Sequence, residues 1–104
     1  MKDYSAAQIK RGLKAAITQF PREGSDTRKL FDVFNEFKGQ VIDFGRYDKY
    51  LDMRIRYLKD FYGMDFVHKG KGQWIFIGEY IGSKYVSYEN SKPLMVKLKV
   101  DLSA

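Results

Sequence analysis

The sequence predicts a single α+β domain spanning residues 1–104, with helices first and strands after them. Three observations lead to this fold class. Apolar residues recur at helical spacing in three successive segments, a glycine-rich turn then separates two short apolar runs, and the final segment alternates between apolar and polar residues. A chain of 104 residues with 44% hydrophobic content is long and apolar enough to bury one core.

The first expected helix opens near the N-terminus. Ser5 followed by Gln8 fits a capping box. Helical spacing then places Arg11 and Lys14 on the side opposite an apolar face made of Ala6, Ile9, Leu13, Ala16, Ile17 and Phe20. Pro21 ends this helix, because the residue before a proline resists the helical conformation.

The second expected helix follows a short polar linker. Ser25 and Asp26 are both candidate N-caps, and Gly39 is the expected stop. Its inner face consists of Leu30, Val33, Phe34 and Phe37. Two short helices with one apolar face each are not stable alone, so we expect them to pack on a third.

The third expected helix covers residues 46–62 and ends at Gly63, which suits the left-handed conformation of a helix C-terminus. Before it, residues 40–45 read as a turn or a very short extended piece, with Asp43 as a candidate cap. Its buried stripe is Tyr47, Leu51, Ile55, Leu58 and Tyr62. The opposite side carries Lys49, Met53, Arg56 and Asp60, with Arg46 and Tyr57 beside them.

Strands are expected in the rest of the chain. Residues 64–67 and 74–77 form a hairpin around a polar tip, residues 68–73, and residues 79–84 read as a bend or loop. A further strand is indicated around Tyr85, Val86 and Tyr88. The clearest strand pattern comes last, where Leu94, Val96, Leu98, Val100 and Leu102 alternate with polar residues. Its apolar face must be covered by the domain core or by a second copy of the chain.

This order of elements resembles a winged-helix DNA-binding domain over residues 5–78, with residues 79–104 as a C-terminal strand extension. The resemblance rests on three helices followed by a hairpin, on the helix end at residues 55–63, and on the glycine-rich tip before Trp74. It implies a three-helix winged helix-turn-helix with one or two extra C-terminal strands. In that family the third helix enters the major groove, and the hairpin, or wing, contacts the backbone or the minor groove.

The resemblance assigns DNA contacts to both elements. The helix would contribute Arg46, Lys49, Tyr50, Met53, Arg56 and Tyr57, the wing would contribute His68, Lys69, Gly70, Lys71 and Gln73, and Arg11 and Lys14 would extend the footprint. Lysines displace counterions from phosphates, arginines bind guanine edges, and glycines let the backbone approach a phosphate. Asp52 and Asp60 weaken this assignment, because carboxylates repel phosphates.

The composition agrees with an anionic partner. Nineteen Lys and Arg against thirteen Asp and Glu give a formal net charge of +6, which favours nucleic acid, an anionic membrane surface or an acidic protein. No cysteine is present, which excludes disulfides and thiolate chemistry. The N-terminus lacks the apolar stretch of a signal peptide, and no apolar run is long enough to span a bilayer. We therefore expect a cytoplasmic or nucleoid-associated protein.

Enzymatic activity is not expected. His68 is the only histidine, no Ser or Cys lies in a nucleophile pattern with it, and the acidic residues are scattered among cations. The sequence therefore indicates no catalytic residue, no metal site, no cofactor and no small-molecule substrate.

The predicted function is duplex-DNA binding by a transcription or replication regulator of bacterial or phage type. One alternative is a protein-interaction module, such as a phage-encoded inhibitor of a host complex, with a host protein or a second copy as partner. Another is single-stranded nucleic-acid binding, with bases stacked on Trp74, Phe76 and Tyr80 if these strand aromatics are exposed. Duplex binding has a simpler alternative, because basic helix faces are often plain solvated surfaces. Base stacking also has one, because Trp74 and Phe76 are equally suited to pack on the helices.

Overall fold

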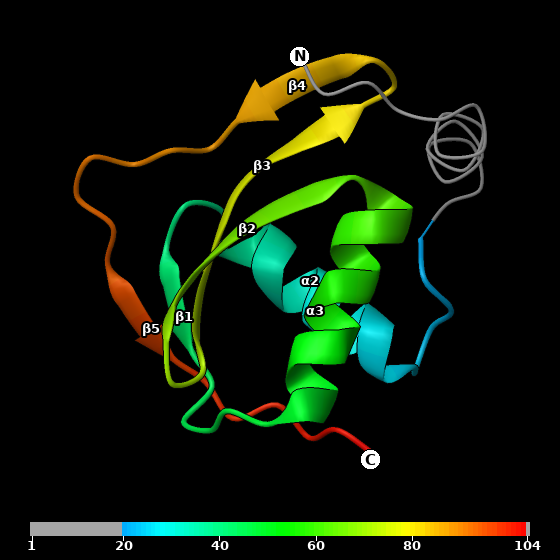
Figure 1. Ribbon diagram of the computed structural model, residues 1–104, viewed down its shortest axis with the longest axis vertical. Coiled ribbons are helices and arrows are strands. Elements are labelled where there is room, and N and C mark those ends of the chain that lie inside the picture. The colour runs from blue at the N-terminus through cyan, green and yellow to red at the C-terminus, as the bar shows by residue number, and fades with distance from the viewer. Residues whose placement is uncertain (1–19, 104) are drawn as a thin grey trace.

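The computed structural model describes residues 20–103, which form two α-helices against a five-stranded mixed sheet (Figure 1). The helices are α2 (Asp26–Glu36) and α3 (Lys49–Tyr62). The strands are β1 (Val41–Asp43), β2 (Met64–Gly70), β3 (Gln73–Ile81), β4 (Lys84–Ser87) and β5 (Met95–Lys97). Neither described helix is both long and apolar enough to cross a membrane.

Strand β3 organises the sheet. It pairs with β2 along one edge, and its other edge is shared by β1 near the start of β3 and by β4 near its end. Strand β5 pairs with the far side of β1 in the parallel direction, where Val41 lies opposite Met95 and Asp43 opposite Lys97. The C-terminal segment is thereby joined to the middle of the chain.

The core lies between the helices and the sheet. Phe34 of α2 is fully buried, and its ring lies 5.7 Å from Phe44, 4.7 Å from Phe66 and 6.5 Å from Phe76, measured between centroids. Leu51, Ile55 and Leu58 bring the apolar stripe of α3 to the same cluster. Burial of each such side chain stabilises the fold by about 1.5–3 kcal/mol.

The helix ends follow the predicted capping chemistry in part. Ser25 is the N-cap of α2 and accepts a hydrogen bond from the backbone N–H of Arg28. Gly63 ends α3 with φ of +68°, which confirms that prediction. The prediction of Asp43 as the cap of α3 is wrong. That role belongs to Asp48, whose carboxylate accepts from the N–H of Leu51 at 2.7 Å.

The predicted three-helix winged helix-turn-helix is wrong. Residues 20–103 contain two helices and a five-stranded mixed sheet, and the first expected helix, with Arg11 and Lys14, falls almost entirely outside the described residues. The segment that changes the architecture is residues 40–45. From the sequence it reads as a turn or a very short extended piece, and Val41–Asp43 is indeed a short strand, but its pairing on both sides, with β3 and with β5, was not expected. A strand of three residues is too short to show a periodic pattern.

The C-terminal region agrees with its apolar pattern and differs in its boundaries. Val96, Leu98, Val100 and Leu102 pack against the core cluster, so the domain core covers this face. Leu94 does not follow them and is 69% exposed. Residues 79–84 are not a simple bend, because β3 continues to Ile81 and pairs with β4.

Candidate nucleic-acid interface

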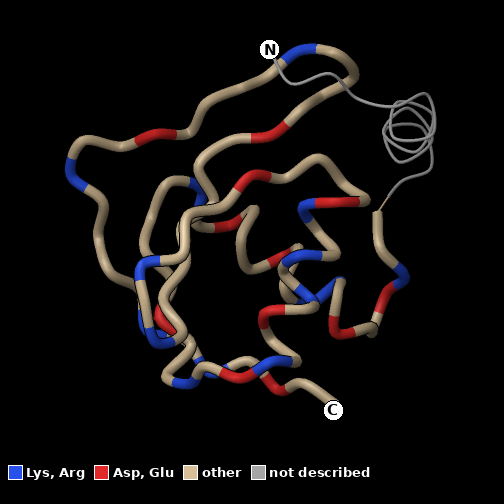
Figure 2. Tube along the Cα trace, viewed as in Figure 1, with Lys and Arg blue, Asp and Glu red and all other residues tan. Residues whose placement is uncertain are grey.

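Three segments that are distant in sequence bring cations to one end of the molecule. They are the turn after β1, the β2–β3 hairpin turn, and the chain at and beyond β5. The N–H of Phe44 donates to the carbonyl of Gly72 at 3.0 Å, and the N–H of Leu98 donates to the carbonyl of Asp43 at 3.0 Å. The basic end, as we call this surface, comprises Arg46, Lys69, Lys71, Lys97 and Lys99, all of which are exposed (Figure 2).

Part of the basic end is hollowed. Arg46 and Lys99 both line a groove of about 520 Å³ whose floor includes Phe44, Leu51 and Leu102. The groove therefore joins the turn after β1 to the chain beyond β5, with one cation contributed by each. Arg46 is held there by an ion pair with Asp48, in which Nη2 lies 2.9 Å from Oδ2, and this pair offsets part of its charge.

The hairpin turn is tighter than the sequence suggested. The expected tip, residues 68–73, reduces to Lys71 and Gly72, because β2 runs to Gly70 and β3 begins at Gln73. Gly72 has φ of +81°, and a Cβ on it would lie 2.0 Å from the carbonyl oxygen of Arg46. Only a glycine lets the turn sit on the backbone of Arg46 without displacing it.

The outer face of α3 is less cationic than its composition suggests. Lys49, Met53 and Arg56 are exposed along it. Arg56 Nη2 lies 3.9 Å from the Asp52 carboxylate, which offsets part of its charge. The first turn of α3, with Lys49, is the part of the helix nearest in sequence to Arg46. Arg46 itself lies before the helix, because α3 begins at Lys49 and not at residue 46.

Two other predicted contact residues, Tyr50 and Gln73, have their polar groups directed into the protein. The Tyr50 hydroxyl donates to the Asp26 carboxylate, and Gln73 Nε2 donates to Asp43 Oδ2 at 3.2 Å. Tyr57 stacks on Phe61 with ring centroids 4.3 Å apart. Gly70 and Lys71 lie exposed at the hairpin turn, at the position the sequence assigned to a wing.

An aromatic column crosses the same end of the molecule. The ring of Tyr47 stacks on His68 at 5.1 Å, and His68 stacks on Trp74 at 4.1 Å. Sequence reading missed this column, because it placed Tyr47 in the buried stripe of the third helix and His68 at a polar tip. The pairing depends on the hairpin register, which sets His68 directly opposite Trp74 and which only the structure shows.

The burial of Trp74 and Phe76 bears on the alternative in which bases stack on strand aromatics. Trp74 and Phe76 are buried, at 7% and 0% exposure, and belong to the core cluster. No base can reach their faces in this fold. Tyr47, in contrast, lies outside the helix and is 53% exposed.

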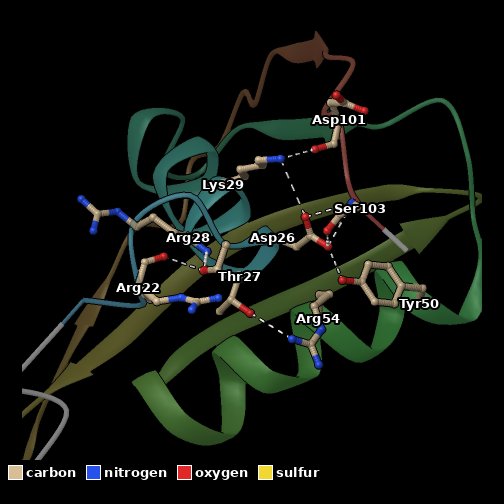
Figure 3. Close-up of polar contacts among 10 residues, drawn as sticks. Arg22, Asp26, Thr27, Arg28, Lys29, Tyr50, Arg54, Asp101 and Ser103 are labelled. Atoms are coloured by element: carbon tan, nitrogen blue, oxygen red, sulfur yellow. Dashed lines mark hydrogen bonds and ion pairs between the residues drawn. The ribbon is translucent and has the colours of Figure 1, made fainter.

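A buried carboxylate links α2, α3 and the end of the described chain (Figure 3). Asp26 accepts hydrogen bonds from the Tyr50 hydroxyl and from the backbone N–H and hydroxyl of Ser103, and Lys29 Nζ lies 3.8 Å away. The hydrogen bond from Tyr50 lowers the pKa of Asp26 against the opposing effect of burial, and the same bond raises the pKa of Tyr50. Every hydrogen bond that the Asp26 carboxylate accepts comes from another residue of the protein. We therefore infer that Asp26 has a structural role.

Within residues 20–103, no three His, Asp or Glu side chains are grouped closely enough to hold a metal ion. His68 is used in the aromatic column, with a ring on either side.

Comparison with known proteins returns no relative. The chain matches no protein-family model, no curated protein and no solved structure.

Proposed function

We propose that this protein binds nucleic acid through the basic end, with its cations on the sugar-phosphate backbone. The observation that supports the proposal is the convergence of Arg46, Lys71 and Lys99 from three separate segments on one surface. The formal net charge of +6 adds a favourable long-range field.

A polyanion is the partner that such a surface suits. The cations lie on backbone segments held by sheet pairing and by the hydrogen bond between Phe44 and Gly72. Cations placed on phosphates release condensed counterions, so binding of this kind weakens as salt rises. Duplex DNA, the partner predicted from the sequence, would extend from the basic end to Lys49 on the first turn of α3.

The test is a salt titration of two matched triple variants. The first replaces cations of the basic end: Lys69→Gln, Lys71→Gln and Lys99→Gln. The second replaces three exposed lysines elsewhere, Lys59→Gln, Lys84→Gln and Lys92→Gln, and so makes the same change in net charge. Labelled duplex and single-stranded oligonucleotides would be titrated by fluorescence anisotropy at several salt concentrations.

The basic-end variant should bind more weakly, and its slope of log affinity against log salt should shrink by about 2 to 3, at 0.7–0.9 per lost phosphate contact. The control variant should keep most of the affinity and slope. Absence of wild-type binding at low salt, or equal losses in both variants, would refute the proposal.

A protein partner is the second candidate, because an apolar row crosses the sheet on the face away from the helices. Val67, Ile75, Val41 and Met95 lie opposite one another across β2, β3, β1 and β5. Val41 and Ile75, in the middle of the row, are buried. Val67 and Met95, at its two ends, are 39% and 50% exposed, and Leu94, next to Met95 in sequence, is 69% exposed. Exposed apolar groups at an accessible sheet face are typical of protein-interaction surfaces.

This second function predicts a different result from the first. A pull-down would recover a stoichiometric protein, and sedimentation would reveal a second copy if that is the partner. Leu94→Ser together with Met95→Ser should abolish such an interaction and leave nucleic-acid affinity unchanged. Retained capture by this variant would argue against the sheet face.

A further inference from the structure

The aromatic column runs from the core to the surface beside the basic end. Its inner member, Trp74, is 7% exposed, and its outer member, Tyr47, is 53% exposed. Successive rings are nearly parallel, with angles of 16° between His68 and Trp74 and 18° between Tyr47 and His68. One face of the Tyr47 ring is covered by His68, and Tyr47 makes no second ring contact among the described residues.

The chain around Tyr47 is anchored on both sides. Arg46 is ion-paired with Asp48 at 2.9 Å, and Asp48 caps α3 through the N–H of Leu51. On the other side, Gly72 of the hairpin turn lies against the Arg46 backbone. Tyr47 is therefore presented by a fixed turn, which reduces the conformational entropy lost when a ligand binds its ring.

We infer that the exposed face of Tyr47 stacks an unpaired nucleobase while the basic end holds the flanking phosphates. This inference rests on the proposed nucleic-acid binding and names the ligand class for it: single-stranded DNA or RNA, or a strand with an extruded base. Single-strand binders combine an aromatic platform with cations that follow the backbone. Here Arg46 precedes the platform in sequence, and Lys71 lies in the turn seated on Arg46.

A duplex offers this site much less. Its bases are stacked on one another, so a paired base must be unstacked before its face can meet an aromatic ring. Every base has such a face, so stacking on Tyr47 would tolerate many sequences. The site therefore predicts a preference for unpaired over paired nucleic acid, with little dependence on sequence.

The first experiment separates base stacking from phosphate binding. Labelled oligothymidylate and an abasic oligomer of equal length would be titrated against the wild type, Tyr47→Leu and Tyr47→Phe. Tyr85→Leu is the matched control, because Tyr85 is also a part-exposed ring but lies on β4, away from the hairpin turn (Figure 1). Circular dichroism and the emission of Trp74, the single tryptophan, would establish that each variant is folded.

The wild type should bind oligothymidylate more tightly than the abasic oligomer. Tyr47→Leu should lose roughly 5- to 150-fold in affinity for oligothymidylate, the range measured for one stacked base, and should no longer distinguish the two oligomers. Tyr47→Phe should keep the preference, because its ring is intact. Oligouridylate in place of oligothymidylate would show whether DNA or RNA is preferred.

A second measurement does not depend on any variant. An oligonucleotide carrying a photoreactive thymine analogue, irradiated with the wild-type protein, should crosslink to the peptide that contains Tyr47. Crosslinks found only elsewhere would overturn the inference.

The two levels of the proposal fail differently. Equal, salt-dependent binding of both oligomers, sensitive to Lys69, Lys71 and Lys99 and indifferent to Tyr47→Leu, would reject base stacking and leave the nucleic-acid function standing. No binding of either oligomer or of duplex at low salt would reject both.

Discussion

The hydroxyl group of Tyr50 donates a hydrogen bond to the carboxylate of Asp26, joining α3 to the first turn of α2. The same carboxylate accepts from Ser103, so the end of the described chain meets both helices on one buried acid. Burial of a charge is unfavourable unless it is paired and hydrogen-bonded. At Asp26 these partners are present.

Replacement of Asp26 by asparagine should destabilise the protein. The amide keeps the shape of the carboxylate but removes its charge and sets an N–H₂ group against donors from Tyr50 and Ser103. We expect a loss of about 1.5–3 kcal/mol in the free energy of unfolding, measured by urea denaturation. Asp32→Asn is the control on the same helix, because within residues 20–103 its 59% exposed carboxylate pairs only with Arg28, and the change should alter stability by less than about 1 kcal/mol. Equal stability of the two variants would contradict the structural role of Asp26.

Stability should fall at acidic pH in a way that depends on Asp26. The hydrogen bond from Tyr50 holds the pKa of Asp26 below its ordinary value of 3.8, so just below that pH the unfolded chain binds the proton and the folded chain does not. The contribution is fully present above pH 3.8 and is lost as pH falls through the lower folded pKa. Urea midpoints measured across this range should fall more steeply for the wild type than for Asp26→Asn. Parallel curves would show that the carboxylate carries no such linkage.

Stability should also fall at alkaline pH because of tyrosines. Burial, followed by a hydrogen bond to Glu79, raises the pKa of Tyr88 from 10.0 to about 12. The unfolded chain therefore releases this proton first, so the contribution is present below pH 10 and is lost as pH rises towards 12. Tyr88→Phe keeps the ring against Phe76 and should flatten this alkaline decline. The loss of stability with rising pH is measured from the midpoints of urea unfolding. An unchanged slope in the variant would count against the assignment.

Two glycine substitutions at the hairpin turn should differ in their effect on nucleic-acid binding. Gly70 and Gly72 both have positive φ, so alanine at either position is strained by about 1–2 kcal/mol. A Cβ at Gly70 meets open space, whereas one at Gly72 would lie 2.0 Å from the carbonyl oxygen of Arg46. Gly72→Ala must therefore also displace the turn that carries Arg46 and Tyr47.

Denaturation and oligonucleotide affinity measured on the same samples provide the comparison. Gly72→Ala should lose more stability than Gly70→Ala and should bind several-fold more weakly per folded molecule. If Gly70→Ala has the larger effect on affinity, the contact between the hairpin turn and Arg46 does not shape the interface.

The parts of the fold that follow from neighbouring residues were predictable. The spacing of Leu30, Phe34, Leu51, Ile55 and Leu58 identified the buried faces of both helices, and all five side chains are buried. Gly63 marked the end of α3, and the alternation from Val96 to Leu102 marked the face that packs on the core. Each signal lies within one element, where the helix or strand period relates side chains a few residues apart.

The candidate site was predictable only where it coincides with such local signals. Lys69 and Lys71 were expected at a hairpin turn and lie at or beside it. Lys97 and Lys99 were not considered, because their place beside the turn after β1 depends on a parallel pairing between β1 and β5. Tyr47 was assigned to a buried stripe and is exposed, because α3 begins two residues later, at Lys49.

The sequence by itself therefore determined α2, α3, the hairpin, the inward face of the C-terminal segment and the excess of positive charge. Only the tertiary structure decided that Val41–Asp43 is a strand between β3 and β5, that Asp26 meets Tyr50 and Ser103, and that Tyr47 stacks on His68. The physical reason is that period and capping act between near neighbours, whereas these contacts join residues 20 or more positions apart, and each was selected from many competing pairings by burial and hydrogen bonding in the whole fold.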